Sequence, residues 1–252
     1  MGTTLRRAFT CLSALLAFSS AASIAQAEGV LDRVAKGGTL VIAHREASIP
    51  FSYVHDGKPM GYALDLCLRL AEQVRKQTGA KLMPVQLMAV TPANRVEMVK
   101  TGKADMECGS TTNNAARRND VGFTVAHFIT GARILVRSDS KIDSADDLTK
   151  KKVVSTKGTT PLAALEQLNR ARYLQMEILT APDHAAAFEM VQKGQADAFV
   201  MDDVLLAGLA ASSKDPKGVK IVGRFLTTEP LAIMLPKDDA AFKKLVDDEM
   251  RR

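Results

Sequence analysis

The stretch Glu107-Cys-Gly-Ser-Thr-Thr-Asn-Asn114 combines a glycine with a run of short polar side chains. A short run at 104–106 precedes it and predicts a strand. Gly109 permits a sharp turn, and five short hydroxyl and amide side chains then follow at the predicted start of a small helix. Unpaired N–H groups and hydroxyls at such a place bind anions, and Arg117 can add a full positive charge. An ordinary helix cap is the alternative interpretation.

The N-terminus, residues 1–27, has the pattern of a secretory signal peptide. Arg6 and Arg7 form its charged region. The apolar segment Cys11–Phe18 is too short to span a bilayer. A small-residue cleavage pattern ends at Ala27, so we expect export to the periplasm and cleavage near that residue.

The charge pattern argues against a nucleic-acid-binding protein. The formal net charge is +6, and removal of the two signal-peptide arginines lowers it to +4. The charges are scattered, Trp is absent, and no basic run is interleaved with aromatic residues. A modest positive balance suits the capture of a small anion. No CxxC motif or histidine cluster indicates a metal site, and we expect no metal and no cofactor.

Strand-like and helix-like segments alternate along the chain, which predicts an α/β protein. The apolar run Thr39–Ala43 predicts a buried strand, and Arg45 follows its carboxyl end. Ligands bind at the carboxyl ends of strands in open α/β sheets, so Arg45 is a candidate ligand contact. A surface arginine in a loop is the alternative.

The first long helix is predicted over Tyr62–Gln77. Its spacing places Leu64, Leu68 and Ala71 on one apolar face, and Gly79 is expected to end it. A further strand is predicted over 82–87.

The next helix is predicted to begin at Thr91-Pro92, with Thr91 as its N-cap. Arg95 lies one turn in, where a positive charge gains nothing from the helix dipole. This position favours a carboxylate contact over a purely structural role. Gly102 is expected to end the helix.

Residues 99–106 resemble residues 191–198, at an offset of 92 positions. Both segments have the pattern of a helix, a glycine C-cap, Ala-Asp and a buried strand. Two similar α/β lobes would explain this repeat. The coincidence of a common helix–turn–strand unit is the alternative.

The second half of the chain has its own candidate residues. Thr160 precedes Pro161 at the predicted start of a helix, where hydroxyls and N–H groups again favour an anion. His184 lies in the first turn of another predicted helix, and a structural role is its alternative. Asp202 and Asp203 end a predicted buried strand, where one carboxylate can meet an ammonium group while the other caps a helix.

Two cysteines, Cys67 and Cys108, remain once the signal peptide is removed with Cys11. An oxidising compartment permits a disulfide between them. Two buried free thiols are the alternative, and the sequence leaves both open.

These segments, taken in order from about residue 30 to the end, resemble the periplasmic glutamate/aspartate-binding proteins of ABC transporters, extracellular solute-binding family 3. The resemblance is carried by the opening stretch together with His44–Glu46, Pro50–Ser52, Gly158–Thr160, Asp183–His184, Met201–Asp203 and Leu205–Gly208.

The resemblance implies a two-lobed periplasmic binding protein of the type II, venus-flytrap fold, with strands as the hinge. Residues 28–130 would form lobe 1, to which residues 231–252 return, and residues 131–230 would form lobe 2. It also implies a monomer that delivers an acidic amino acid to the membrane permease subunits of an ABC transporter.

The resemblance further implies three sets of contacts to one ligand. They are Arg117, Ser110, Thr112 and Thr160 for the α-carboxylate, Asp202 for the α-ammonium, and Arg45, Arg95 and His184 for the side-chain carboxylate.

The sequence departs from the family pattern in places. Pro92 stands where the family has a serine, Lys157 stands where a small residue is common, and the family pattern continues beyond Met250. We expect a binding protein and not an enzyme. An enzyme resembling cyclohexadienyl dehydratase, with Glu46 or Glu107 as acid or base, and a sensing module for a receptor are the alternatives.

Overall fold

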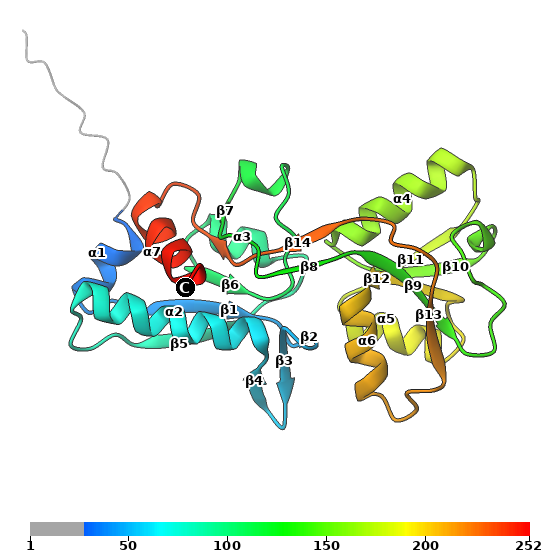
Figure 1. The fold of residues 1–252 in the computed structure, drawn as a ribbon, viewed down its shortest axis with the longest axis horizontal. Coiled ribbons are helices and arrows are strands. Elements are labelled where there is room, and N and C mark those ends of the chain that lie inside the picture. The colour runs from blue at the N-terminus through cyan, green and yellow to red at the C-terminus, as the bar shows by residue number, and fades with distance from the viewer. Residues whose placement is uncertain (1–27) are drawn as a thin grey trace, which may run out of the picture.

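The computed structural model describes residues 28–252, so the predicted signal peptide lies outside the described residues. The chain forms two lobes, each built on a five-stranded sheet (Figure 1). We call them lobe 1 and lobe 2 after these sheets. The sheet of lobe 1 has the order β5-β1-β6-β15-β7, with β1 Leu40–His44, β5 Val85–Ala89, β6 Met106–Cys108, β7 Gly122–Phe123 and β15 Met234–Leu235.

The sheet of lobe 2 has the same arrangement as that of lobe 1. In both sheets, three neighbouring strands are parallel to one another, and the fourth strand is antiparallel to them. The strand order in lobe 2 is β11-β10-β12-β9-β13, with β9 Ala132–Arg137, β10 Lys152–Thr156, β11 Glu177–Ala181, β12 Ala198–Asp202 and β13 Val219–Val222.

Helices pack on both sheets and bury their apolar faces against the strands. Those of lobe 1 are α1 Val30–Ala35, α2 Tyr62–Thr78, α3 Arg95–Lys100 and α7 Ala240–Met250, and those of lobe 2 are α4 Thr160–Arg172, α5 His184–Gln192 and α6 Asp203–Ser212. Residues 28–252 also contain the short 3-10 turns η1 Arg117–Asn119 and η2 Asp146–Leu148. No helix within residues 28–252 is both long and apolar enough to cross a membrane.

Two antiparallel strands connect the lobes, β8 Phe128–Thr130 leading out of lobe 1 and β14 Glu229–Leu231 leading back (Figure 1). Their register pairs Glu229 with Thr130. A small sheet of β2 Ala47–Ser48, β3 Ser52–His55 and β4 Lys58–Met60 projects from lobe 1. Paired strands, and not a flexible tether, therefore form the hinge.

The internal repeat in the sequence has a structural counterpart. The Asp105 carboxylate accepts a hydrogen bond from the Val41 N–H at 2.7 Å, and the Asp197 carboxylate accepts one from the Lys152 N–H at 2.9 Å. Each aspartate thus caps the start of a neighbouring parallel strand in its own sheet. The two lobes share this helix–turn–strand unit.

Two details of lobe 1 differ from the prediction. Leu68 is 43% exposed, because α2 packs the stripe of Leu64, Cys67 and Val74 inward, and each residue turns the helix by about 100°. Leu82, predicted to begin a strand, is 73% exposed, and β5 begins at Val85.

The cysteine alternative is resolved in favour of a disulfide. Cys67 of α2 is bonded to Cys108 of β6, with their Cα atoms 6.3 Å apart. Both residues are fully buried. The bond fastens the longest helix of lobe 1 to the central part of its sheet.

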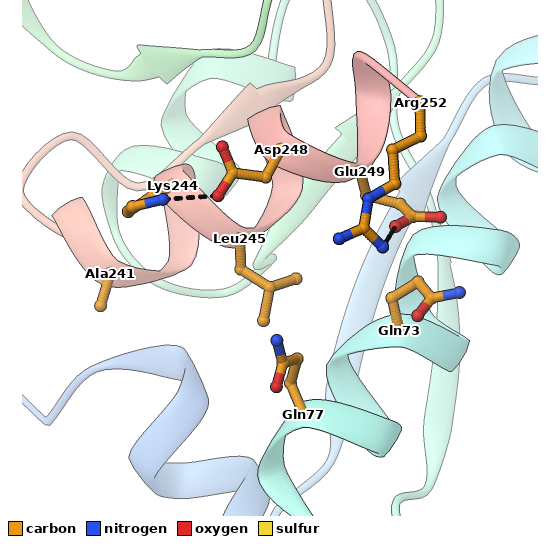
Figure 2. A pocket seen from close by; sticks show the side chains of 8 residues that line it. All are labelled: Gln73, Gln77, Ala241, Lys244, Leu245, Asp248, Glu249 and Arg252. Carbon is orange, nitrogen blue, oxygen red and sulfur yellow. Dashed lines mark hydrogen bonds and ion pairs between the residues drawn. The ribbon is translucent and has the colours of Figure 1, made fainter.

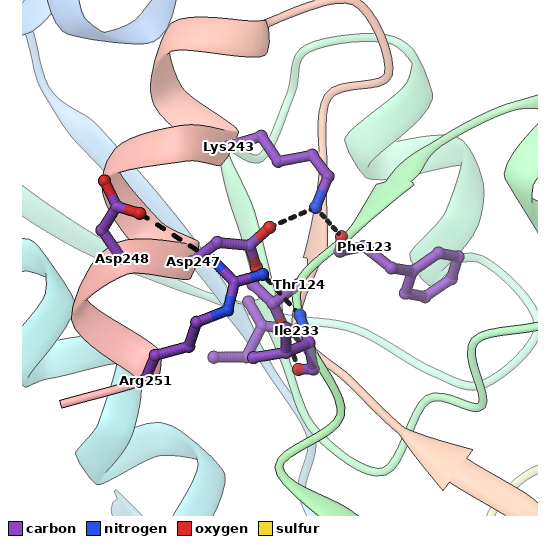
Figure 3. A network of polar contacts seen from close by, with 8 residues as sticks. Phe123, Thr124, Ile233, Lys243, Asp247, Asp248 and Arg251 are labelled. Atoms are coloured by element: carbon purple, nitrogen blue, oxygen red, sulfur yellow. Dashed lines mark hydrogen bonds and ion pairs between the residues drawn. The ribbon is translucent and has the colours of Figure 1, made fainter.

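The C-terminal helix α7 returns to lobe 1 and is held by polar contacts (Figure 3). Lys243 donates a hydrogen bond to the carbonyl oxygen of Phe123 at 2.6 Å and pairs with Asp247. Asp247 also accepts a bond from the Val125 N–H at 2.8 Å. The helix begins at Ala240 with Asp239 as its N-cap. On its other side, a groove separates it from α2 (Figure 2).

Candidate functional site

Three arginines from separate segments of lobe 1 lie at the junction of the lobes. Arg45 follows β1 and is 1% exposed, and Arg95 begins α3 and is 2% exposed. Arg117 is half-buried and donates a hydrogen bond from Nη2 to the carbonyl oxygen of Gly158 in lobe 2, at 3.2 Å. Burial, reinforced by the charge of Arg95, lowers the pKa of Arg45 to about 9 and that of Arg117 to about 10. Arg45 and Arg117 therefore remain charged at neutral pH, and a guanidinium group such as that of Arg95 keeps its proton in proteins, so the three side chains favour a nearby anion.

Two buried carboxylates lie among these arginines. Glu107 is fully buried on β6 and accepts a hydrogen bond from the Thr111 hydroxyl at 2.5 Å. Asp202 ends β12 and is 3% exposed. Burial, and then the negative charge of Glu229, raise the pKa of Asp202 to about 8, while Arg95 opposes the shift. A cation placed beside Asp202 would favour its ionised form.

Several buried polar atoms around these charges have no hydrogen-bond partner among residues 28–252. They include Nε and Nη1 of Arg45, Nε of Arg95, Nε2 of His184 and Oδ1 of Asp202. Burying such atoms unpaired is costly, and most are paired in folded proteins. The arginine N–H groups match the oxygens of a carboxylate, whereas the Asp202 oxygen matches a donor such as an ammonium group. The two kinds of requirement together fit a zwitterion with an additional negative charge.

His184 comes from lobe 2 and is 1% exposed. Asp183 caps its helix and thereby places the imidazole at the start of α5. Its Nδ1 lies 2.8 Å from the hydroxyl oxygen of Thr156. Burial and the positive charges of Arg45 and Arg95 hold its pKa well below the usual range, so the imidazole is neutral. If Thr156 donates to Nδ1, the proton resides on Nε2, which can then donate to a ligand.

Two hydroxyls and a carboxylate meet at the hinge. The hydroxyls of Thr112 and Thr160 each donate to Oε2 of Glu229, both at 2.6 Å. Glu229 is 2% exposed, and the two hydroxyl oxygens lie 3.0 Å apart. Thr112 belongs to lobe 1 and Thr160 to lobe 2, so these contacts join both lobes to the hinge strand.

The stretch after Gly109 does not start an α-helix, contrary to the prediction. Thr112 forms an antiparallel bridge with Leu231, and the Asn113 N–H donates to the carbonyl oxygen of Pro230 at 2.8 Å. The chain returning from lobe 2 therefore pairs with this segment and holds it extended, and only the short turn η1 follows.

The two nearby arginines contact carbonyl oxygens of this extended segment. Arg117 Nη1 donates to the carbonyl oxygen of Thr112 at 2.8 Å, and Arg95 Nη1 donates to that of Ser110 at 3.5 Å. Ser110 itself is buried. The contacts fix the positions of the guanidinium groups while leaving some of their N–H groups free.

The helix caps near the site differ in detail from the prediction. Thr159 caps α4, and its side chain accepts from the Leu162 N–H at 3.3 Å, so the predicted helix start at Thr160 is capped by the preceding residue. The Thr160 hydroxyl is therefore available to Glu229. Thr91 and Asn94 cap each other's N–H groups through their side chains ahead of α3, so Thr91 acts as a cap although α3 begins only at Arg95.

The lobes approach each other closely at two glycines of lobe 2. A Cβ atom at Gly158 would lie 2.7 Å from the carbonyl oxygen of Pro92, and one at Gly208 would lie 2.6 Å from that of Ile49. Both carbonyl oxygens belong to lobe 1. Such distances leave no room for a side chain, so the glycines permit a closed arrangement of the lobes.

The structure thus brings all eight candidate residues to one region between the lobes. Electrostatic interactions connect the charged and titratable residues Arg45, Arg95, Arg117, His184 and Asp202. Hydrogen bonds connect Ser110, Thr112 and Thr160 to this set of residues or to one another.

Sequence reasoning missed Glu229 and Thr156. An acidic residue before Pro230 was the available signal for Glu229, but its position at the hinge required the fold. Among residues 28–252, no group of three or more His, Cys, Asp or Glu side chains is placed to hold a metal ion.

Comparison with known sequences gives matches over most of the chain. The bacterial extracellular solute-binding proteins, family 3, match residues 40–252. The glutamate/aspartate import solute-binding protein of Escherichia coli K12 is 39% identical over 244 residues, covering 94% of this chain and 81% of the relative. The L-glutamate/L-aspartate-binding protein of Pseudomonas aeruginosa is 42% identical, covering 87% of this chain and 73% of the relative.

Solved structures show the same fold. A cysteine-binding protein from Campylobacter jejuni matches with a TM-score of 0.75 at 26% identity, covering 88% of this chain and 86% of that chain. An ancestral arginine-binding protein bound to arginine matches with a TM-score of 0.75 at 24% identity, covering 85% of this chain and 91% of that chain. The second likeness concerns the fold alone.

Proposed function

The chain belongs to the bacterial extracellular solute-binding proteins, family 3, and we propose that it binds glutamate or aspartate between its two lobes. It delivers the amino acid to the membrane permease subunits of an ABC transporter. Relatives that are 39% and 42% identical carry glutamate and aspartate in their names, which supports this ligand class.

The observation that carries the proposal is the pair of buried guanidinium groups of Arg45 and Arg95. Both are almost fully buried, both leave N–H groups without a partner among residues 28–252, and they repel each other. A ligand carboxylate would satisfy these N–H groups and offset the repulsion, whereas a cationic side chain would add to it. His184, from the opposite lobe, would complete this contact with its Nε2.

The remaining ligand groups are assigned by charge. Arg117 holds the α-carboxylate, with Ser110, Thr112 and Thr160 beside it. Asp202 holds the α-ammonium, since its Oδ1 is buried and needs a donor. The lobes close on the ligand by motion about the two hinge strands.

We also propose the boundaries and the setting of the protein. Residues 28–130 and 231–252 form lobe 1, and residues 131–230 form lobe 2. The protein is a periplasmic monomer whose signal peptide is cleaved near Ala27, and it has no enzymatic activity.

Isothermal titration calorimetry of the purified protein against the twenty amino acids tests the ligand class. We expect measurable binding of glutamate and aspartate and none of arginine or lysine. Preferential binding of a cationic amino acid would overturn the proposal. Incubation with a prephenate-like substrate tests the absence of catalysis, and turnover would favour an enzyme.

A further inference from the structure

Glu229 occupies a position that the ligand contacts above do not explain. It lies on the hinge strand β14, is 2% exposed, and uses one oxygen, Oε2, to accept from two hydroxyls. Those hydroxyls, of Thr112 and Thr160, also lie within hydrogen-bond distance of each other. Three segments that are far apart in sequence therefore share one compact cluster.

The protons available to this cluster fix the direction of its hydrogen bonds. Each hydroxyl carries one proton, and a carboxylate can only accept. Two protons serve three close contacts, and the charged acceptor forms the stronger bonds. When both protons point to Glu229, neither remains between Thr112 and Thr160, and both hydroxyls turn lone pairs away from Glu229.

Taking the proposed function as its basis, we infer that Glu229 is a positioning residue for the ligand ammonium. It takes the protons of the Thr112 and Thr160 hydroxyls, so that these hydroxyls accept from the ammonium group instead of donating to the α-carboxylate. Its negative charge also adds to that of Asp202. The two threonines then serve the ammonium group, and Arg117 remains the contact for the α-carboxylate.

The electrostatics of the neighbouring residues agree with this role. The charge of Glu229 raises the pKa of Asp202, so the two carboxylates are close enough to interact electrostatically. It also acts on Arg117, the proposed contact of the α-carboxylate. Because Thr112 and Thr160 belong to different lobes, the pair of acceptors is complete when the lobes are closed. Glu229 therefore links ammonium recognition to closure.

The variant Glu229→Gln tests the inference, because it keeps the size of the side chain but removes the charge. Its amide can donate to a hydroxyl and turn it into a donor. We expect at least tenfold weaker binding of L-glutamate by calorimetry. We expect less than a threefold change for L-2-hydroxyglutarate, which carries a hydroxyl in place of the ammonium group. An unchanged affinity for glutamate, or an equal loss for both ligands, would overturn the inference.

A second pair of variants keeps the test decisive if Glu229→Gln does not fold. Thr160→Val removes the hydroxyl and should weaken glutamate binding at least fivefold, whereas Thr160→Ser retains it and should bind within twofold of the parent protein. Equal affinities for these two variants would contradict the inference. Where all variants fold, the losses of glutamate-binding free energy caused by Glu229→Gln and Thr160→Val should not add in the double variant, because both substitutions act through one cluster. A parent protein that does not bind glutamate would instead refute the proposed function.

Discussion

The Cα atom of Gly208 in lobe 2 faces the carbonyl oxygen of Ile49 in lobe 1 so closely that an added Cβ would lie 2.6 Å from that oxygen. Gly208 is within α6, where backbone geometry accepts any residue, so packing between the lobes is the constraint on its size. Closure of the lobes therefore depends on the absence of a single methyl group.

Gly208→Ala should weaken glutamate binding at least tenfold, because the added methyl group prevents full closure over the ligand. The same change should leave the melting temperature of the ligand-free protein equal or higher, since alanine favours a helix over glycine by about 1 kcal/mol. Calorimetry and thermal unfolding check these opposite effects. The neighbouring exposed residue provides a matched control, because Ala207→Gly should lower the melting temperature and keep the affinity. Unchanged binding by Gly208→Ala would show that closure tolerates the methyl group.

Arg95→Met should weaken binding of glutamate and aspartate at least tenfold, which is about 1.4 kcal/mol or more. The variant removes a buried guanidinium whose Nε has no partner among residues 28–252. The free energy of unfolding of the ligand-free protein should therefore fall by less than the binding free energy does. Titration calorimetry measures the affinity. The exposed Arg118, in the same part of lobe 1, supplies the control, and Arg118→Met should bind normally. Equal affinities of the two variants would contradict the role of Arg95.

The affinity for glutamate should rise with pH between about pH 6 and pH 8. Burial and Glu229 raise the pKa of Asp202 from 3.8 to about 8, and Asp203 adds to the shift, whereas Arg95 and Arg117 oppose it. In the ligand-free protein, the stabilisation linked to this raised pKa is complete below about pH 4 and is lost as the pH rises through 8. The ligand ammonium favours the ionised carboxylate, so binding below pH 8 releases a proton.

Calorimetry in two buffers of different ionisation enthalpy measures that proton release. The effect should reach at most about tenfold in affinity per pH unit. Asp202→Asn should bind weakly and without pH dependence in this range. A flat profile for the parent protein would mean that Asp202 is already ionised before the ligand arrives.

Loss of the disulfide should destabilise lobe 1. The bond between Cys67 and Cys108 spans 41 positions, for which the chain-entropy relation gives about 4 kcal/mol. Thermal unfolding of Cys67→Ala/Cys108→Ala should show a lower melting temperature. A reductant should lower that of the parent protein and leave the double variant unaffected. Equal melting temperatures for the parent and the double variant would contradict a stabilising bond.

Local sequence patterns predicted the elements of the fold well where one segment determines its own structure. Gly79 and Gly102 end their helices in the left-handed conformation that only glycine adopts readily, as expected. The repeat around Asp105 and Asp197 could be detected in the sequence because both lobes use an aspartate at the same place. Each aspartate accepts a hydrogen bond from a strand of its own sheet. Leu68 was misplaced because its spacing from Leu64 fits the apolar face, and the neighbouring sheet and α7 determine which edge of that face is covered.

The sequence allowed the charged residues of the site to be predicted, but not their arrangement in space. The extended course of Ser110–Asn114 depends on pairing with Leu231 and its neighbours, more than a hundred residues later in the chain. The role of Glu229 depends on a meeting of both lobes at the hinge. Contacts of this kind are long-range, and no local periodicity reports them.

A crystal structure of the protein grown with L-glutamate would reveal the orientation of the ligand. We expect the ligand between the lobes, with its side-chain carboxylate at Arg45 and Arg95, its α-carboxylate at Arg117 and its ammonium at Asp202. A ligand bound outside the cleft, or one with its ammonium group facing Arg45, would refute the proposed binding mode.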